Sequence, residues 1–262
     1  MIKILDEKIK VRVSDFLRQT LELDAIAFNF IKPNGEANLN LFLNKLIPNL
    51  LLLKKARREE ILEYAKEQFD IAEDEADFTE KIVNGLNTIF ESIYFSDGEL
   101  DELTQVIWIR PSNDNRAVFD EIIESETEIT GLEPSVYIRN LLNEFSRLPR
   151  YKKEQITFQE ESEKTLLARD SGRELKFRYE NEIHRAFVFA CVYNYLQEQG
   201  NYVLCYDIGL NIICRYQISE ITALHVLDKK YKPSDIVREL CERYAEEGLW
   251  LDDEVLEVGG DE

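Results

Sequence analysis

Residues 8–13 form a short segment in which basic and apolar side chains alternate with a period of two. This period is that of a β-strand, because successive side chains of a strand point to opposite faces. We therefore expect a half-buried strand that places its apolar side chains in a core and its cations in solvent. The three cations are Lys8, Lys10 and Arg12.

The order strand, helix, turn, helix occurs twice in the N-terminal half of the chain. After the first strand, Ser14 can cap a helix, and a turn around Gly35 precedes a second apolar helix that Pro48 is expected to kink or end. The distance from the end of the strand to the glycine of the turn is 22 positions in both copies. The second copy has a strand at 105–109, a helix at 113–125, a turn at 131–134 and a helix at 136–148.

The distribution of charge separates the first copy from the rest of the chain. The 262 residues carry a formal net charge of −20 at pH 7, which argues against a coat of cations over the whole surface. Residues 1–60 hold 11 bases and 8 acids, whereas residues 61–102 hold 2 bases and 13 acids. A local basic strip near the N-terminus therefore remains compatible with the composition.

Between residues 175 and 227 the pattern changes to short strands, punctuated by Gly200 and Gly209, which predicts a small barrel. Ser234 can then cap a C-terminal helix, and residues 252–262 are expected to be disordered. The fold class is therefore expected to be α+β. Its five expected parts are a first strand-helix-helix copy at 1–60, an acidic helical connector at 61–102, a second copy at 103–154, a β-barrel domain at 155–231, and a C-terminal helix with an acidic tail at 232–262.

Residues that catalysis and metal binding usually need are scarce. The two histidines, His184 and His225, lie in strand-like runs, where structural roles are expected. The glycines form no phosphate-binding loop, and no His/Cys cluster has the spacing of a zinc site. We therefore expect a protein that is not an enzyme and has no cofactor or metal.

The four cysteines form no CxxC pair, and three lie in apolar runs, a pattern typical of a reducing compartment. The chain begins without a recognisable secretory signal, and its apolar stretches are too short to span a bilayer as a helix. These features favour a cytoplasmic protein with no membrane partner.

The segment at 173–228 resembles a WYL domain. Residues 185–189 (Arg-Ala-Phe-Val-Phe) are similar to the family's stretch in which an arginine leads into a strand, although the family's proline is absent. Residues 201–203 (Asn-Tyr-Val) occupy the place of the Trp-Tyr-Leu signature and keep its tyrosine. Residues 216–221 match the closing Phe-Arg-Leu-Asp-Arg-Ile pattern in their apolar positions, with glutamine and glutamate in place of the two arginines.

This resemblance implies a small Sm-like barrel that senses a nucleotide or a nucleic acid. Arg185 and Arg215 remain as candidate phosphate ligands, and Tyr202 and Tyr206 as candidate stacking partners. The alternative is that the tyrosines belong to the core of the barrel and the arginines to its surface.

The repeated segment resembles a ribbon-helix-helix unit, in which two strands pair as a ribbon whose outward side chains enter the major groove. Usually two chains supply the two strands. Here one chain carries both copies, so we expect an intramolecular pseudo-dimer. In the second strand Thr104, Val106 and Trp108 take the outward positions, so only the first strand is basic. Alternatively, both strands are structural and the ribbon mediates dimerisation of the chain.

A ribbon-helix-helix unit joined to a WYL domain is similar to the accessory regulators of type VI-D CRISPR systems, which bind single-stranded RNA. The resemblance implies a non-enzymatic regulator of a defence or transcription system that binds single-stranded RNA or DNA. Lys8, Lys10 and Arg12 would contact phosphates or bases, and Trp108 would stack on a base. The alternative function is a ligand-sensing or protein-interaction module that does not bind nucleic acid and whose acidic stretches face a basic protein.

Overall fold

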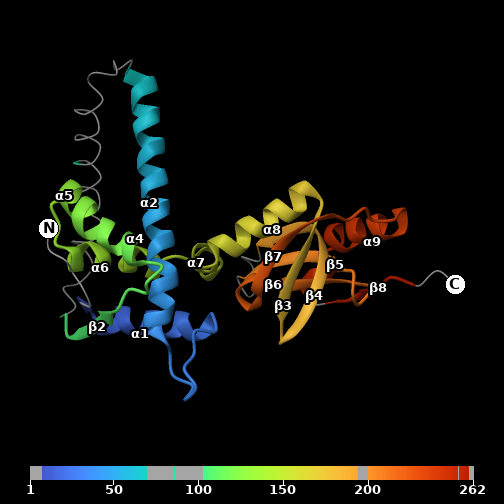
Figure 1. Cartoon of the computed structure of the whole chain (residues 1–262), viewed down its shortest axis with the longest axis horizontal. Helices are drawn as coiled ribbons and strands as arrows, with labels where there is room; N and C mark the ends of the chain where they lie inside the picture. Colours follow the sequence, from blue (N-terminus) through green and yellow to red (C-terminus); the bar gives the residue numbers. More distant parts are fainter. Residues whose placement is uncertain (1–7, 70–84, 86–102, 194–199, 253, 260–262) are drawn as a thin grey trace. The chain divides into compact units, whose positions relative to one another are not determined.

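The structure is a computed structural model that describes residues 8–69, 85, 103–193, 200–252 and 254–259 (Figure 1). It divides into two compact units, residues 1–148 and residues 149–262, each of which is described by itself below. Both units contain helices and strands, so the expected α+β class is confirmed. The finer division into five parts stays a prediction, and most of the expected acidic connector at 61–102 lies outside the described residues.

The first unit contains a two-stranded antiparallel ribbon. β1 (Ile9–Val13) pairs with β2 (Gln105–Ile109), and Lys10 lies directly opposite Trp108. Four inward side chains of the two strands are at most 4% exposed, and burial of each contributes about 1.5–3 kcal/mol, so these side chains anchor the ribbon. These side chains are Val11, Val13, Ile107 and Ile109. The expected pairing of the two segments within one chain is confirmed.

Two helical segments separated by a turn follow each strand. α1 (Asp15–Ala27) begins after Ser14, whose hydroxyl oxygen accepts a hydrogen bond of 3.1 Å from the backbone N–H of Leu17, as expected for a cap. A turn then leads into α2 (Leu39–Phe69). After β2 come α4 (Arg116–Glu121), a π-helical turn (Ile122–Glu126), α5 (Thr127–Thr130) and α6 (Pro134–Ser146). The helix expected at 113–125 is therefore divided into several segments, and the order of elements is as expected.

The helices of the first unit bury apolar side chains together with the ribbon. The rings of Phe42 on α2 and Phe145 on α6 have their centres 6.1 Å apart, which is within the range of aromatic pairs. The fully buried side chains include Leu17, Leu21, Phe42, Leu43, Leu46, Ile47, Phe119, Ile138, Leu142 and Phe145. This core holds the ribbon against α1, α2 and α6.

Pro48 lies inside α2 and does not end it, contrary to one of the two outcomes expected for it. Proline has no N–H, so the carbonyl of Asn44, four residues earlier, loses its helical donor. The side-chain amide of Asn115 donates to this carbonyl instead. The side chain of Asn44 in turn accepts a hydrogen bond of 2.7 Å from the N–H of Ser112 and donates one of 2.9 Å to the carbonyl of Arg110. The second copy thus satisfies the backbone group that the proline leaves open.

The second unit joins helices to a six-stranded antiparallel sheet with the order β7-β3-β4-β5-β6-β8. Its helices are α7 (Arg150–Thr157), α8 (Gln159–Ser171) and α9 (Asp235–Glu246). Its strands are β3 (Arg173–Tyr179), β4 (Glu182–Tyr193), β5 (Asn201–Asp207), β6 (Ile212–Gln217), β7 (Thr222–Lys230) and β8 (Leu256–Glu257). As expected, Ser234 caps α9, its hydroxyl accepting from the N–H of Val237.

Two expectations for the second unit differ from what its strands form. Among the described residues no pairing between β7 and β8 closes the sheet, so the small Sm-like barrel is not confirmed. The tail was expected to be disordered, but its residues Leu256 and Glu257 pair with Ile213 and Ile212 as strand β8. Leu256 and Val258 explain this difference, because they give an otherwise acidic tail side chains that pack against the core.

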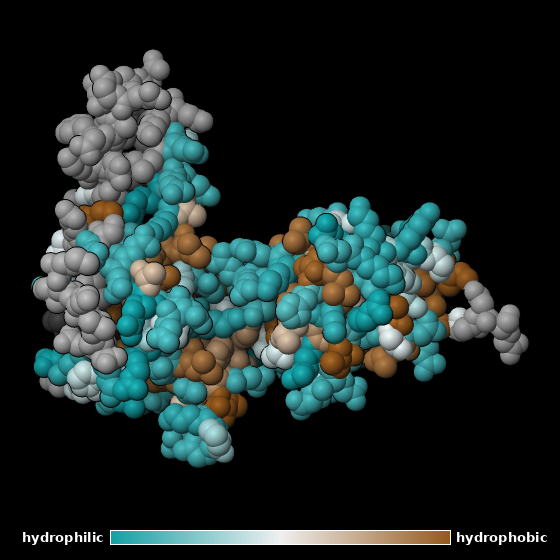
Figure 2. Space-filling model, viewed as in Figure 1, coloured by the Kyte–Doolittle hydropathy of each residue, from teal (hydrophilic) through white to brown (hydrophobic). Residues whose placement is uncertain are grey.

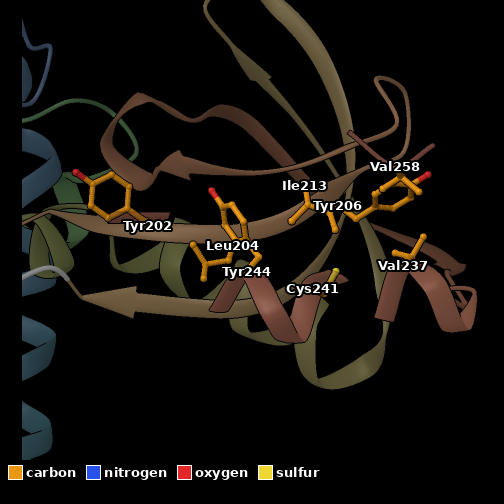
Figure 3. Packing of buried hydrophobic residues seen from close by; sticks show 8 residues of the cluster. All are labelled: Tyr202, Leu204, Tyr206, Ile213, Val237, Cys241, Tyr244 and Val258. Carbon is orange, nitrogen blue, oxygen red and sulfur yellow. The ribbon is translucent and has the colours of Figure 1, made fainter. Parts of the chain in front are cut away.

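A hydrophobic core lies between α9 and the strands β5 and β6 (Figure 3). Tyr202, Leu204 and Tyr206 occupy alternate positions of β5 and therefore share one face of the sheet. The other members of the core are Ile213, Val237, Cys241, Tyr244 and Val258. The apolar side of α9 thus packs on this part of the sheet.

Glu154 on α7 is fully buried and connects this helix to the sheet. One of its carboxylate oxygens accepts hydrogen bonds from the backbone N–H (2.6 Å) and the side-chain amide (2.9 Å) of Asn201. The other accepts from the amide of Gln217 at 3.1 Å and from the backbone N–H of Ser219 at 3.3 Å. Four donors compensate for the loss of water around this carboxylate.

In the part of the chain that the structure describes, no helix is both long and apolar enough to cross a membrane. The surface of the view in Figure 2 is mostly hydrophilic. It has a hydrophobic patch over α2, the helix whose exposed leucines are Leu41, Leu52 and Leu53.

Candidate nucleic-acid interface

The outward face of the β1–β2 ribbon brings together three of the four residues that the sequence marks for nucleic-acid contact. Lys10 and Arg12 are exposed on β1, Trp108 is 53% exposed on β2, and Lys8 is exposed directly before β1 begins. The ammonium nitrogen of Lys10 lies 5.7 Å from the centre of the Trp108 ring, a distance typical of a cation–π contact. The ribbon thus presents cations next to a half-exposed indole.

The register explains why this face has its composition. Antiparallel pairing places Lys10 opposite Trp108 and Arg12 opposite Val106, and directly opposite residues share a face. The inward positions of β1 are apolar, and its two outward positions, Lys10 and Arg12, are cations. Lys10 and Arg12 form no ion pair with any residue that the structure describes, so their charges are available to a ligand.

Two further arginines hold the ribbon rather than extend its charged face. Arg18 of α1 donates from Nη1 to Oε1 of Gln105 at 3.1 Å and also pairs with Glu22. Arg139 of α6 donates from Nη1 to the backbone carbonyl of Arg12 at 3.4 Å, and burial lowers the pKa of its guanidinium. These contacts tie both strands of the ribbon to the helices of the first unit.

The two strands of the ribbon differ in chemistry on the face they share. β1 offers lysine and arginine, whereas β2 offers Val106 and Trp108. A ribbon with two equivalent strands presents the same side chains twice, as palindromic duplex sites require. This ribbon presents a row of cations beside a single aromatic ring.

In the second unit the structure brings together two of the four residues expected to bind a ligand. The guanidinium carbon of Arg215 on β6 lies 4.4 Å from the centre of the Tyr202 ring on β5. Tyr202 is only 3% exposed and belongs to the core of Figure 3, where its ring also lies 6.3 Å from that of Trp250.

The other two expected ligand residues have partners of their own. Arg185 on β4 donates from both Nε and Nη2 to Oε2 of Glu174. Tyr206 is 7% exposed, and its hydroxyl donates to Oδ1 of Asn211 at 2.6 Å. Both tyrosines are thus part of the core, in line with the alternative interpretation, while a ligand role for the four residues stays a prediction.

A buried polar network that sequence reasoning missed joins His184, Asp207 and Tyr216. Nδ1 of His184 lies 2.7 Å from Oδ2 of Asp207, and the hydroxyl of Tyr216 donates to the same oxygen at 2.8 Å. Oδ1 of Asp207 accepts from the backbone N–H groups of Gly209 and Leu210 at 2.9 and 3.0 Å. Burial raises the pKa of Tyr216 above its ordinary value, so its hydroxyl remains a donor.

This network resembles a catalytic arrangement only in its residue types. The His184 side chain is 8% exposed, and the ring centres of Phe177, Tyr179 and Tyr216 lie 5.1–6.3 Å from the centre of its imidazole. Only the register of β4, β5 and β6 brings the three polar residues together, so no motif in the sequence could have found them. Their geometry fits the structural role expected for His184. No group of His, Cys, Asp and Glu suited to a metal ion occurs among the residues described.

Comparison with known proteins gives a fold and no family. No protein-family model matches the chain, and no curated protein matches it. Solved structures do match. One of them, described as the crystal structure of a CRISPR Cas-related protein, is similar with a TM-score of 0.62 and 13% identity, over 88% of this chain and 66% of that chain.

At 13% identity this likeness shows a shared fold. The chain spans 66% of the length of the CRISPR Cas-related chain, so a third of that protein has no counterpart here. The WYL domain and the ribbon-helix-helix unit are not confirmed by these comparisons, and both resemblances stay predictions.

Proposed function

We propose, on the premise of a fold shared with a CRISPR Cas-related protein, that this chain is a CRISPR-associated regulator that binds single-stranded nucleic acid through the outward face of its ribbon. The observation that carries the proposal is the pairing of β1 with β2, which sets exposed Lys10 beside exposed Trp108. Cations bind phosphates without regard to sequence, and an exposed aromatic ring stacks on an unpaired base. One face of one ribbon offers both contacts.

The asymmetry of the ribbon favours a single strand over a duplex. A palindromic duplex site has two equivalent halves, which two equivalent strands of a ribbon can contact in the same way. Here the cations lie on β1 and the aromatic ring lies on β2. Bases of a duplex are also stacked on one another and closed to an indole. A single strand offers its phosphates to Lys8, Lys10 and Arg12 and an open base to Trp108.

The order and pairing of the elements also support the resemblances to a ribbon-helix-helix unit and to a WYL domain, which remain part of the proposal. A strand followed by two helices, twice in one chain and paired through the strands, is the order of a ribbon-helix-helix pseudo-dimer. The antiparallel sheet of the second unit would then be the WYL-like part. We infer a non-enzymatic, cytoplasmic role in a defence system.

The test is fluorescence anisotropy with labelled single-stranded RNA, single-stranded DNA and duplex probes, from about 50 to 200 mM salt. Wild-type protein is expected to bind a single strand, with an affinity that falls as salt rises. The slope of log K against log salt is negative, and each cation that no longer neutralises a phosphate of a single strand reduces its magnitude by about 0.7. Lys10→Ala/Arg12→Ala should therefore reduce the magnitude by about 1.4.

The matched control is Lys32→Ala/Lys164→Ala, which removes the same charge from two exposed lysines that already pair with Glu36 and Glu160. The control should bind as the wild type does. No binding to any probe at low salt, or equally weakened binding in both double variants, would contradict the proposal.

A second candidate function is ligand sensing by the second unit, and the contact between Arg215 and Tyr202 favours it. A nucleotide whose phosphate meets this guanidinium should raise the melting temperature, and Arg215→Ala should abolish the rise. A melting temperature that stays unchanged across a panel of nucleotides would count against this candidate.

A further inference from the structure

One face of the sheet in the second unit carries basic side chains on three neighbouring strands. Lys176 on β3 lies directly opposite Arg185 on β4 and directly opposite His225 on β7. Arg178 lies two residues further along β3, on the same side as Lys176. All four side chains are exposed. We call this set, together with Lys229 of β7, the cationic sheet face.

A tight turn fixes the register that assembles the cationic sheet face. Glu180 and Asn181 join β3 to β4, and both have positive φ, 48° and 69°. Two successive residues with positive φ form the kind of two-residue turn whose twist matches an antiparallel hairpin. The position of Arg185 opposite Lys176 is therefore set by the local chain.

The acids close to the cationic sheet face do not neutralise it. Glu174, which is fully buried, is shared between Arg185 and the Nζ of Lys229, the latter at 2.8 Å. This one carboxylate faces two cations. Lys176 and Arg178 form no ion pair with any of the residues that the structure describes.

Like charges that lie directly opposite each other across paired strands destabilise a sheet. In a chain with 52 acids and 32 bases, a carboxylate at one of these exposed positions would remove the repulsion. Lys176 and Arg178 therefore carry positive charge that no ion pair among the described residues balances, in a protein whose net charge is −20. An anionic ligand is the partner that would offset the repulsion.

The geometry points to the phosphate groups of a nucleic-acid strand as the ligand of the cationic sheet face, which gives the second unit its own nucleic-acid contact; the class of ligand rests on the function proposed above. Lys176 and Arg178 are about 6.6 Å apart along the strand, and the neighbouring strands lie about 4.8 Å to either side, so the charges lie close together on one face of the sheet. A guanidinium and an ammonium are both phosphate ligands, and they need no particular base.

The apolar side chains next to Lys176 and Arg178 offer no group that reads a base. Ile183, which lies opposite Arg178, is 63% exposed and can neither stack as an aromatic ring does nor donate. Phe177, which alternates with the cations along β3, is 2% exposed and lies on the opposite face. Contacts of Lys176 and Arg178 with phosphates therefore do not depend on the sequence of the strand, in contrast to the contact of the ribbon's indole.

The test compares Lys176→Ala/Arg178→Ala with wild-type protein, with Lys10→Ala/Arg12→Ala and with the control Lys32→Ala/Lys164→Ala, using single strands of several base compositions. The sheet variant is expected to reduce the magnitude of the slope of log K against log salt by about 1.4. It should also weaken binding by the same factor for every base composition. Its melting temperature should equal or exceed that of the wild type, because the variant removes like charges from one face of the sheet.

The failures of the two proposals are distinguishable. If the ribbon variant weakens binding and the sheet variant has the wild-type affinity and slope, the inference about the sheet is overturned and the proposed function stands. If the sheet variant abolishes binding and the ribbon variant does not, the sheet is the contact surface and the ribbon is not. Polyglutamate that binds the wild type as tightly as a single strand does, and no longer binds the sheet variant, would overturn the inference in favour of an acidic protein. Wild-type protein that binds no probe removes both proposals.

Discussion

The ammonium group of Lys10 and the indole of Trp108 meet across the β1–β2 ribbon, 5.7 Å apart, although 98 positions separate them in the chain. The contact exists because the alternation of β1 and that of β2 place both side chains on the outward face. It gives the candidate interface a charged group and a stacking group at one point.

If Trp108 stacks on a base, its removal should weaken binding more than the removal of an ordinary surface side chain. Stacking on an aromatic side chain contributes about 1–3 kcal/mol per base, so Trp108→Ala should raise the Kd about 5- to 150-fold, and Trp108→Phe by less. Anisotropy with a single-stranded probe measures the change. Tyr64→Ala is the control, since Tyr64 is a 64% exposed aromatic residue on α2. Equal effects of Trp108→Ala and Tyr64→Ala would show that the indole is not a stacking platform.

The pairing of β1 with β2 can be trapped by a disulfide. Arg12 lies directly opposite Val106, where side chains are close enough for a cross-link after a small adjustment. Arg12→Cys/Val106→Cys treated with oxidised glutathione should give a monomer with an internal disulfide, seen as a band of changed mobility on a non-reducing gel. Arg12→Cys alone should give no such band. A disulfide-linked dimer as the main product would mean that the ribbon forms between two chains.

Glu154 should be among the residues on which the stability of the second unit depends most. Glu154→Ala leaves the buried N–H groups of Asn201 and Ser219 without their acceptor, and each such group costs about 1–3 kcal/mol. We expect a fall of about 2–5 kcal/mol in the free energy of unfolding, measured by urea denaturation. Glu160→Ala, at an exposed i,i+4 pair with Lys164, should cost less than about 0.5 kcal/mol. A fall at Glu154 no larger than that of the control would refute the anchoring role.

Glu174 should make the second unit sensitive to acid. Burial raises its pKa, but hydrogen bonds from Lys229 and Arg185 and the charges of these two cations outweigh burial, so its pKa lies below the ordinary value of 4.5. A carboxylate whose pKa is lowered by folding stabilises the folded state above its ordinary pKa, and this stability is lost as the pH falls through the folded value.

The free energy of unfolding of the wild type should therefore fall below about pH 4.5, and Glu174→Gln should show a smaller fall over the same range. Urea denaturation at neutral pH and at successively lower pH measures both. Asp235→Asn, at a 97% exposed carboxylate, is the control and should keep the wild-type dependence. Parallel curves for wild type and Glu174→Gln would exclude the role of this carboxylate.

The sequence predicted those elements whose pattern is local. The alternation at 8–13 and the hydroxyl groups of Ser14 and Ser234 act within one turn or one strand, and each appears where expected. The pairing of β1 with β2 could be inferred as well, because the two strands head copies with equal spacing. Lys10, Arg12 and Trp108 lie on the outward face of the ribbon for the same reason, whereas Lys8 precedes the ribbon.

Features that depend on distant contacts could not be predicted. Pro48 is tolerated because Asn115 donates to the carbonyl that it exposes, 71 positions from the carbonyl's own residue. The network of His184, Asp207 and Tyr216 needs the register of three strands. Lys176 and Arg178 alternate visibly with apolar residues, but only the turn at Glu180 and Asn181 reveals that Arg185 faces them.

That one polypeptide supplies both strands of the ribbon has a consequence for how the protein responds to its abundance. A ribbon shared by two chains falls apart on dilution, so its binding curve contains an association step between proteins. Here β1 and β2 belong to one chain, so every folded copy of the protein contains the complete ribbon. Occupancy should then follow the concentration of the nucleic acid alone, even in a cell that holds only a few copies of the protein. Each strand can also change by mutation without altering its counterpart, which is a freedom that a symmetric pair of chains lacks.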